Sequence, residues 1–282
     1  MKVITQIKAL REYLNSIRKN DKSIGFVPTM GALHEGHLTL VRQSVKENLF
    51  TVCSIFVNPT QFNDPADLKK YPRTLQKDCE MLEEAGCDLV FAPDTSEVYP
   101  SEATISLTFG YLEEILEGKF RPGHFQGVGL VVSKLLHMVQ PDRAYFGQKD
   151  YQQFLIIQTL VKDLNFPVKL IRVPIIREKD GLAMSSRNMR LSEEERAAAP
   201  VFFEALNAAA EVLKRDKNVN GARALAGRLI EEKNGVSLEY FEIAHPDTLK
   251  PLSNETVGDE VVLCVAGYVG NIRLIDNLIV NI

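Results

Sequence analysis

The stretch SIGFVPTMGALHEGHLTL, residues 23–40, joins a short apolar run to the start of a helical pattern. Residues 23–28 combine β-branched and aromatic side chains and end at a proline, which is typical of a buried strand. A helix is expected from about Gly36, so the residues between form a strand-to-helix loop. Gly31 and Gly36 allow its backbone to approach a ligand closely. The unpaired N–H groups at a helix start also favour an anion.

The same alternation of strand and helix patterns continues to about residue 176. Further strands are expected at 51–59, 88–93, 143–147 and 168–174, and helices at 4–20, 36–48, 73–86, 123–139 and 150–164. Strands separated by helices predict a parallel sheet with helices on both faces. Such sheets bind ligands at the carboxyl ends of their strands. We therefore expect an α/β domain over residues 1–176.

The pattern changes in the last third of the chain. Ser192 and Glu195 are spaced as a capping box, which opens an alanine-rich helix running towards Lys214. A second helix is expected near 220–233, followed by strands at 237–245, 261–270 and 272–280. Gly270-Asn271 is a hairpin signal between the last two strands. These elements predict a smaller α+β domain over residues 177–282, which we interpret as a lid.

Composition excludes some classes of protein. The 282 residues carry a net charge of -4 with scattered basic residues, which disfavours a nucleic-acid partner. Four cysteines show no metal-binding spacing, and Cys53 and Cys264 are expected as buried apolar residues. The charged N-terminus lacks a signal-peptide pattern, and no apolar run approaches the roughly 20 residues that span a bilayer. We expect a cytoplasmic protein without membrane association.

His34 and His37 are three residues apart, and three readings of this pair are open: metal ligands, phosphate contacts or solvated surface. A zinc site needs a third ligand and usually has the spacing H-E-x-x-H on a helix. Imidazoles in a loop at a sheet edge can instead donate hydrogen bonds to phosphate oxygens. The position and the flanking glycines favour the phosphate reading.

Other polar clusters follow other predicted strands. FGQKDYQQF (146–154) offers Lys149 for phosphate and Asp150 for Mg²⁺ or a ribose hydroxyl. GLAMSSRN (181–188) offers Ser185, Ser186 and Arg187 as phosphate-binding groups, although an interdomain linker is the alternative. SIFVNPTQF (54–62) supplies neutral amides suited to a small substrate with hydroxyl or carboxylate groups. RPGHFQG (121–127) supplies an arginine and a histidine, with a plain surface loop as the equal alternative.

Taken together and in order, these motifs resemble the pantoate–β-alanine ligase (pantothenate synthetase) family over nearly the whole chain. The motifs are PTMGALHEGH, SIFVNPTQF, YPRTLQKDCE, LVFAP, RPGHFQGV, FGQKDYQQ and DGLAMSSRN. HEGH is similar to the HIGH signature of a nucleotidyltransferase superfamily, and MSSR stands where its members carry a KMSKS loop. The resemblance implies a Rossmann-like parallel-sheet domain, a smaller C-terminal lid, a homodimer and Mg²⁺-ATP.

The resemblance also implies site residues. For ATP it implies Met30, Gly31, Ala32, Leu33, His34, Glu35, Gly36, His37, Gly147, Gln148, Lys149, Asp150, Ile176, Met184, Ser185, Ser186 and Arg187. Catalytic roles are implied for His37, His34, Lys149 and Arg187, with His37 as a proton donor. Substrate contacts are implied for Gln61, Gln153, Asn58, Tyr71 and Arg121, of which the two glutamines would hold pantoate. Asp150 is the predicted contact for Mg²⁺.

The implied reaction condenses pantoate with β-alanine through a pantoyl adenylate and releases AMP and pyrophosphate. A rival enzyme is another HIGH-motif nucleotidyltransferase, which would stop after nucleotide transfer. A non-catalytic nucleotide-binding regulator is a rival from another class, although binding alone does not need the full His, Lys, Ser and Arg set. Short length and acidic charge disfavour an aminoacyl-tRNA synthetase.

Overall fold

The computed structural model describes residues 1–63 and 65–282, without the side chains of residues 65–67. The chain divides into two compact units. The first unit comprises residues 1–147 and 153–173, and the second comprises residues 148–152 and 174–282. In the described part of the chain, no helix is long and apolar enough to cross a membrane.

The first unit contains a parallel sheet in the order β1-β4-β3-β2-β5-β6. Its strands are β1 (Lys2–Ile4), β2 (Ile24–Thr29), β3 (Phe50–Ile55), β4 (Leu89–Phe91), β5 (Arg143–Gly147) and β6 (Lys169–Val173). The order reverses at β2, since β3, β4 and β1 continue on one side and β5 and β6 on the other. The switch point therefore lies between β2 and β5, where open α/β sheets bind ligands.

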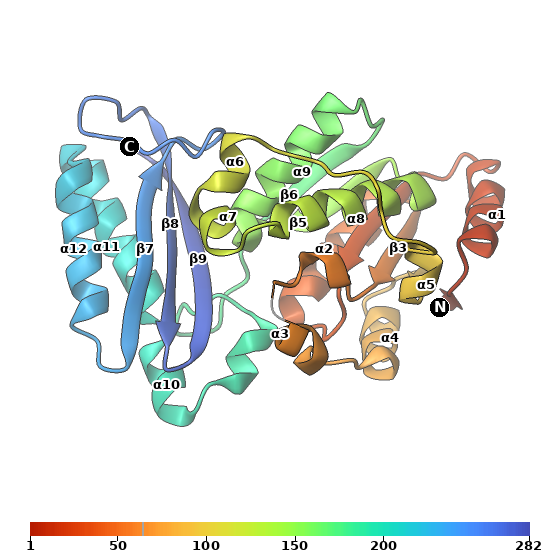
Figure 1. Ribbon diagram of the computed structural model, residues 1–282, viewed down its shortest axis with the longest axis horizontal. Helices are drawn as coiled ribbons and strands as arrows, with labels where there is room; N and C mark the ends of the chain where they lie inside the picture. The colour runs from red at the N-terminus through yellow and green to blue at the C-terminus, as the bar shows by residue number, and fades with distance from the viewer. Residues whose placement is uncertain (64) are drawn as a thin grey trace. The chain divides into compact units, whose positions relative to one another are not determined.

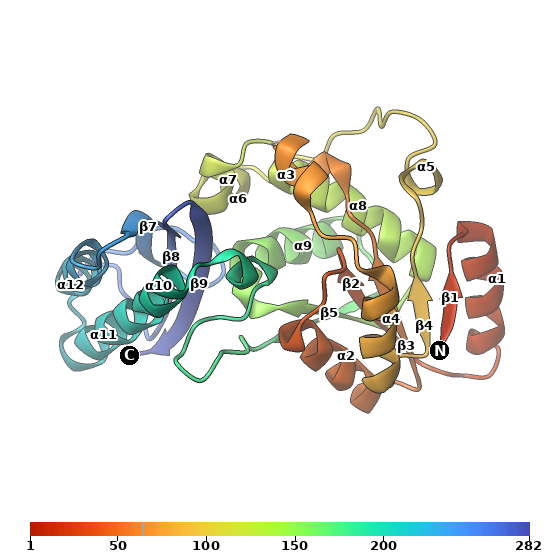
Figure 2. The same ribbon diagram turned by 90° about the horizontal axis from the view of Figure 1, so that it is seen from below.

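Helices cover both faces of this sheet. The helices along this part of the chain are α1 (Ile7–Arg18), α2 (Glu35–Glu47), α3 (Pro65–Lys70), α4 (Leu75–Glu84), α5 (Thr95–Val98), α6 (Tyr111–Glu114), α7 (Leu116–Phe120), α8 (His124–Val139) and α9 (Tyr151–Asp163), with a 3-10 turn η1 (Pro59–Gln61). Figure 2 shows α8 and α9 on one side of the sheet and α2 and α4 on the other. Beneath α2 and α4, side chains of five strands form an apolar core that includes Val27, Cys53 and Val90.

The second unit packs two long helices on an antiparallel sheet. Its elements are η2 (Gln148–Asp150), η3 (Ser186–Arg190), α10 (Glu193–Ala198), α11 (Val201–Asp216), α12 (Val219–Glu231), β7 (Val236–Ala244), β8 (Glu260–Val269) and β9 (Ile272–Asn281). The sheet order is β7-β8-β9, and α11 and α12 cover one of its faces (Figure 1). The predicted fold class, a parallel α/β sheet plus a small α+β unit, is confirmed.

Two predicted elements were wrong in detail. The first helix was expected over 4–20, but residues Lys2–Ile4 form an edge strand and the helix begins at Ile7. A three-residue strand carries little local signal, because its pairing with β4 is a long-range event. The helix opened by Ser192 ends at Ala198, and a second one begins at Val201. Pro200 lies between them. It has no N–H to donate, and a proline ring clashes with the carbonyl of the residue four positions earlier, so a continuous helix is disfavoured.

Other local predictions are confirmed. Ser192 and Glu195 form the expected capping box, with the Ser192 hydroxyl accepting from Glu195 N–H and the Glu195 carboxylate from Ser192 N–H. β8 and β9 pair as a hairpin with Val269 opposite Ile272, so Gly270-Asn271 is its turn. Cys53 and Cys264 are buried, as expected of small apolar residues. Burial raises the pKa of the Cys53 thiol, which keeps it protonated and inert.

We predict that Gly127→Ala and Gly227→Ala change stability in opposite directions, although both lie inside helices. A Cβ on Gly127 would stand 2.2 Å from the Thr60 carbonyl oxygen of η1, and one on Gly227 would meet nothing within 4 Å. Gly127→Ala should lower the free energy of unfolding by about 1–3 kcal/mol through overpacking. Gly227→Ala should raise it by about 0.5–1 kcal/mol. Urea denaturation measures both, and equal signs would contradict the close approach of α8 to η1.

Candidate functional site

The loop after β2 satisfies its own backbone amides. Residue 78, an aspartate on α4 that is 1% exposed, accepts the N–H of Ala32 at 3.0 Å and of Leu33 at 2.9 Å, one on each carboxylate oxygen. Thr74 donates its hydroxyl to the same carboxylate. Between β2 and the first turn of α2, the backbone N–H groups of six residues donate to other groups of the protein: Gly31, Ala32, Leu33, His34, Gly36 and His37. The prediction of unpaired amides at the helix start was therefore wrong for Gly36 and His37.

The two histidines of the loop use one ring nitrogen each for the loop's own backbone. His34 Nδ1 accepts the Gly36 N–H at 3.2 Å, and His37 Nδ1 accepts the His34 N–H at 3.4 Å. The two rings are in contact, with centroids 4.1 Å apart and planes tilted by 43°. A neutral imidazole whose Nδ1 accepts carries its proton on Nε2. Both rings are thus set as Nε2–H donors, and an anion at this position would meet these side chains rather than the engaged backbone amides.

The other side chains of the loop point elsewhere. Ala32 and Leu33 are buried, so only their main chain could meet a nucleotide. Ala32 also holds a φ of +51°, a left-handed conformation that the Asp78 contact stabilises. Glu35 forms an ion pair with Arg42 farther along α2. Within the predicted range 30–37, the two imidazoles are therefore the polar side chains best suited to bind phosphate.

Gln61 lies at the end of η1, where it is buried and contacted by several neighbouring groups. Its Nε2 contacts Met30 Sδ at 2.9 Å, and its Oε1 accepts from Asn58 Nδ2 at 3.2 Å. His124 Nδ1–H donates to the Gln61 carbonyl oxygen at 2.9 Å. Gly127 admits η1 against α8, because any side chain there would meet Thr60 and Gln61. The RPGHFQG motif, for which a plain surface loop was the equal alternative, in fact supports Gln61.

Asn58 differs from the substrate contact that the resemblance implied. It is 1% exposed, and its Oδ1 accepts from Thr60 at 3.0 Å and Tyr99 at 2.9 Å. Its Nδ2 donates to Gln61 Oε1 and to the Gly127 carbonyl. The amide is thus engaged by protein groups at both ends. This geometry fits a residue that positions Gln61 better than one that binds a substrate.

Four further predicted residues lie in the first unit. Tyr71 packs its ring edge-on against Phe62, with centroids 5.7 Å apart. Arg121 follows α7 and lies 3.8 Å from the Glu117 carboxylate. Gly147 ends β5 opposite Val173 of β6, next to the switch point. Gln153 is half-buried on α9.

In the second unit, the residues after β5 form the turn η2. The Lys149 side chain is 18% exposed, and its Nζ lies 4.0 Å from Asp150 Oδ1. Asp150 is half-exposed, and among the described residues no group of three or more His, Cys, Asp or Glu side chains could hold a metal ion. The main chain of η2 is fixed by Asn277 of β9.

The segment 176–188 is an ordered hairpin rather than an extended linker. Met184 N–H donates to the Ile176 carbonyl at 2.9 Å, and Gly181 makes the turn with a φ of +93°. Ser185 then caps η3 by accepting the Arg187 N–H at 3.2 Å. A pocket of the second unit is lined by Lys149, Ser185, Arg187, Asn188, Arg273 and Asp276, among others. The structure thus brings the predicted lysine, serine and arginine together.

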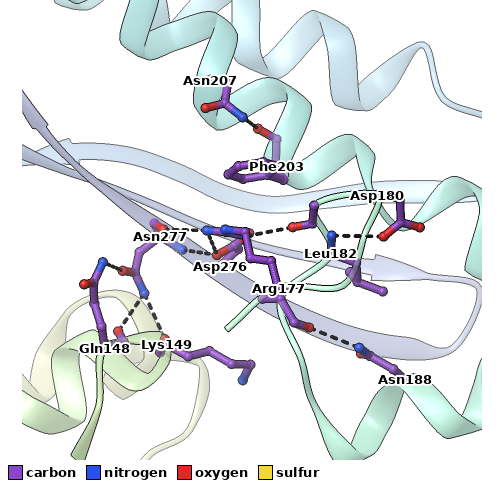
Figure 3. A network of polar contacts seen from close by, with 12 residues as sticks. Gln148, Lys149, Arg177, Asp180, Leu182, Asn188, Phe203, Asn207, Asp276 and Asn277 are labelled. Carbon is purple, nitrogen blue, oxygen red and sulfur yellow. Dashed lines mark hydrogen bonds and ion pairs between the residues drawn. The ribbon is translucent and has the colours of Figure 1, made fainter. Parts of the chain in front are cut away.

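A buried ion pair holds this hairpin to β9. Arg177 donates to both carboxylate oxygens of Asp276, at 2.6 and 2.9 Å, and stacks 3.8 Å from the centroid of the Phe203 ring. Figure 3 shows the guanidinium between that ring and Asp276. Burial raises the pKa of the Asp276 carboxyl, and the hydrogen bonds from Arg177 oppose that rise. Removing either partner would leave the other charge buried and unpaired, which is strongly destabilising.

Sequence reasoning missed three residues that hold the site: Asp78, Asp276 and Asn277. A weak signal existed for each. Asp78 lies four residues before Leu82 on the buried face of α4, where an acid is unexpected. Asp276 and Asn277 interrupt the apolar pattern of IRLIDNLIV. A polar residue in an apolar stripe marks a buried hydrogen-bonding group, but its partner is not readable from the chain.

Fold and site define a doubly wound α/β protein with donor side chains at the carboxyl edge of its sheet and an antiparallel second unit that carries a cationic pocket. A family model described as pantoate-beta-alanine ligase matches residues 2–279. A pantothenate synthetase from Cytophaga hutchinsonii is 47% identical over 278 residues, covering 98% of each chain. The crystal structure of pantothenate synthetase from Thermus thermophilus has a TM-score of 0.93 at 45% identity, covering 99% of both chains.

A third relative is the Francisella tularensis pantoate-beta-alanine ligase, crystallised with β-γ ATP and β-alanine. It has a TM-score of 0.76 and 36% identity, and the match covers 99% of this chain and 97% of that one. The present chain belongs to the pantoate–β-alanine ligase family. The resemblance inferred from the motifs is thereby confirmed.

We predict that Asp78→Asn loosens the loop after β2. An amide has one acceptor oxygen, so one of the Ala32 and Leu33 N–H groups would face an NH₂ group. A buried donor left without a partner costs about 1–3 kcal/mol. Hydrogen exchange of a peptide covering residues 29–40 should therefore become faster.

The matched control is Asp88→Asn. Asp88 also accepts a backbone N–H, that of Thr51 at 2.7 Å, but near the amino end of β3. This change should leave exchange in residues 29–40 unaltered. Unchanged protection of the loop in Asp78→Asn would show that the carboxylate does not hold it.

Proposed function

We propose that this protein condenses (R)-pantoate with β-alanine in an ATP-dependent reaction, giving pantothenate, AMP and pyrophosphate through a pantoyl-adenylate intermediate. The observation that carries the proposal is the pair of imidazoles at the start of α2, each of which accepts at Nδ1 and therefore carries its proton on Nε2. Family membership across residues 2–279 supports the same chemistry. It is a carbon–nitrogen ligase that forms AMP.

In the first step, a pantoate carboxylate oxygen attacks the α-phosphorus of ATP, and the bond to the bridging oxygen of the β-phosphate breaks. Negative charge then grows on the departing pyrophosphate. Positioned donors stabilise such charge. The donors that we propose are His34 and His37 of the first unit and Lys149, Ser185, Ser186 and Arg187 of the second. His37 would be the proton donor.

Adenylation serves to activate the acid. A carboxylate is a poor acyl donor, because its leaving group would be oxide, whereas an acyl adenylate loses AMP. In the second step, the neutral amine of β-alanine attacks the acyl carbon, the carbon–oxygen bond to AMP breaks, and the new amide nitrogen loses one proton to solvent. The step needs no covalent enzyme nucleophile. The buried thiols Cys53 and Cys87 fit this account, since burial raises the pKa of each and that of Cys87 to about 12.

We propose that Gln61 and Gln153 bind pantoate, and that Gln61 also lies beside β-alanine. A neutral amide can donate to a carboxylate and accept from a hydroxyl, and pantoate carries both groups. The supports around Gln61, from Asn58, His124 and Gly127, fix where its amide lies. Tyr71 and Arg121 are proposed for the same site.

Magnesium would enter with the nucleotide. Mg²⁺ is commonly held by one or two carboxylates together with substrate phosphates, so a single exposed carboxylate such as Asp150 fits that role. When bound, the ion would neutralise phosphate charge. The remaining proposed nucleotide contacts are the main chain of residues 30–36, the segment 147–150, Ile176 and Met184.

The family resemblance supports three further proposals. Residues 1–176 would bind nucleotide and pantoate, and residues 177–282 would act as a lid. The protein would be a homodimer, which sedimentation equilibrium tests directly. It would work in the cytoplasm on small molecules, without nucleic-acid or membrane partners.

A product assay tests the function. Protein, Mg²⁺-ATP and pantoate are mixed, and AMP is measured with and without β-alanine. Free AMP should form in quantity only when β-alanine is present, with pantothenate in equal amount. A nucleotidyltransferase that stops at the first step would give pyrophosphate without free AMP, and a regulator would give neither product.

We predict that Lys149→Ala and His34→Ala each remove adenylation while the fold remains intact. Loss of one positioned donor to transition-state charge costs about 10²–10³ in rate. Pantoate-dependent exchange of pyrophosphate into ATP measures this step alone. Lys214→Ala is the control, since Lys214 is exposed and its ion pair is with Glu211 on its own helix. Wild-type exchange in a folded Lys149→Ala or His34→Ala protein would reject the assignment.

We also predict that Gln61→Ala and Gln153→Ala raise the KM for pantoate by about tenfold, the value of one or two hydrogen bonds. The KM for ATP should change little. Gln76→Ala is the control, because Gln76 is exposed and contacts Glu80 on the same helix. Unchanged pantoate kinetics in either variant would remove that glutamine from the substrate site.

A further inference from the structure

One buried amide on β9 binds the main chain of the turn that carries Lys149. Asn277 is 2% exposed, and its Nδ2 donates to the carbonyl oxygens of Gln148 at 3.0 Å and Lys149 at 2.9 Å. Its Oδ1 accepts from Gln148 Nε2 at 3.2 Å. Figure 3 shows these contacts converging on Asn277. Both amide protons are thus used on two successive carbonyls, which fixes the orientation of two successive peptide planes.

Asn277 is itself held in place by the ion pair beside it. Its N–H donates to Asp276 Oδ1 at 2.7 Å, and its carbonyl accepts from Arg177 Nη2 at 3.2 Å. Arg177 also donates to the Gly181 carbonyl at 3.0 Å, so the same guanidinium anchors the hairpin that leads to Ser185 and Arg187. One cluster therefore ties β9, the η2 turn and the hairpin together.

Asp276 and Asn277 point to opposite faces of β9. Ile272, Leu274 and Val280 of β9 lie in the apolar core, and Asp276 shares their face because side chains alternate along a strand. Asn277 consequently points to the opposite face, where it meets η2. Asp276 lines the pocket that contains Lys149 and Arg187, whereas Asn277 is not among its lining residues. Asn277 thus contacts the η2 turn, which contains Lys149, and does not line the pocket.

We propose that Asn277 is a positioning residue for Lys149: by binding two carbonyls of the η2 turn, it sets the direction in which Lys149 presents its ammonium group to the nucleotide. The proposal rests on the proposed function, because it takes Lys149 as a phosphate contact. Lysine has a long flexible side chain, and its reach depends on where its backbone is fixed. Figure 3 shows the Lys149 side chain extending away from Asn277.

Kinetics of Asn277→Ala in the full-length protein give the first test. Loss of a support behind a functional side chain typically costs 10–100-fold in activity, so kcat/KM for ATP in pyrophosphate exchange should fall by about that factor. The KM for pantoate should stay within about twofold of wild type, since Gln61 and Gln153 are untouched. Asn207→Ala is the matched control: Asn207 is exposed and donates to the Phe203 carbonyl of its own helix.

Asn277→Asp keeps the size of the side chain if the alanine variant does not fold. Its second carboxylate oxygen would face the two carbonyl oxygens that Nδ2 now binds. The loss in kcat/KM for ATP should be at least as large. Wild-type ATP kinetics in either folded variant would overturn the proposal, as would an equal rise in the KM for ATP and for pantoate.

A double-mutant cycle on ATP binding separates positioning from general support. The Kd for ATP is measured calorimetrically for wild type, Asn277→Ala, Lys149→Ala and the double variant. If Asn277 acts through Lys149, the double variant should bind ATP no more weakly than Lys149→Ala. Losses that multiply would overturn the proposal. The cycle needs no pantoate, so a protein that binds ATP but fails to make pantothenate would refute the proposed function and leave this test standing.

Discussion

A parallel sheet brings the carboxyl ends of all its strands to one edge, and most of this structure follows from that constraint. The strand order reverses at β2, so the chain leaves β2 and its neighbour β5 in opposite directions. The loop that follows β2 ends at His34, the N-cap of α2, and His37 lies in the first turn of that helix. Lys149 lies two residues beyond the end of β5. Residues more than a hundred positions apart in sequence thus follow adjacent strand ends.

A buried carboxylate stabilises the functional segment in each unit. In the first unit, Asp78 binds two backbone N–H groups of the loop after β2 and holds Ala32 in a left-handed conformation. In the second, Asp276 binds Arg177, which fixes the hairpin before Ser185. Buried charge is unfavourable without partners, so each carboxylate admits few arrangements of the chain around it. The cost of burying each carboxylate is offset by the hydrogen bonds that it accepts.

The proposed site residues carry clearer signals in the sequence than the residues that support them. Gln61, Lys149 and Arg187 carry groups whose chemistry is evident from the side chain, and their motifs occur in a recognisable order. Asn58 belongs to the same motif as Gln61, yet its amide is engaged by Thr60, Tyr99 and Gly127. Motif membership did not separate the two amides, because their distant partners, Tyr99 and Gly127 for Asn58 and Met30 for Gln61, are set only by the fold.

By itself, the sequence determined the alternation of strands and helices, the hairpin at Gly270, the capping box at Ser192 and the family. These depend on local periodicity and on residue types at short spacing. Only the tertiary structure decided that the loop amides after β2 are engaged, that residues 2–4 are a strand and that Asn277 fixes η2. The Asp78 and Asn277 contacts join residues 46 and 128 positions apart. A hydrogen bond over such a separation forms only when packing brings its donor and acceptor together, and no local pattern records that event.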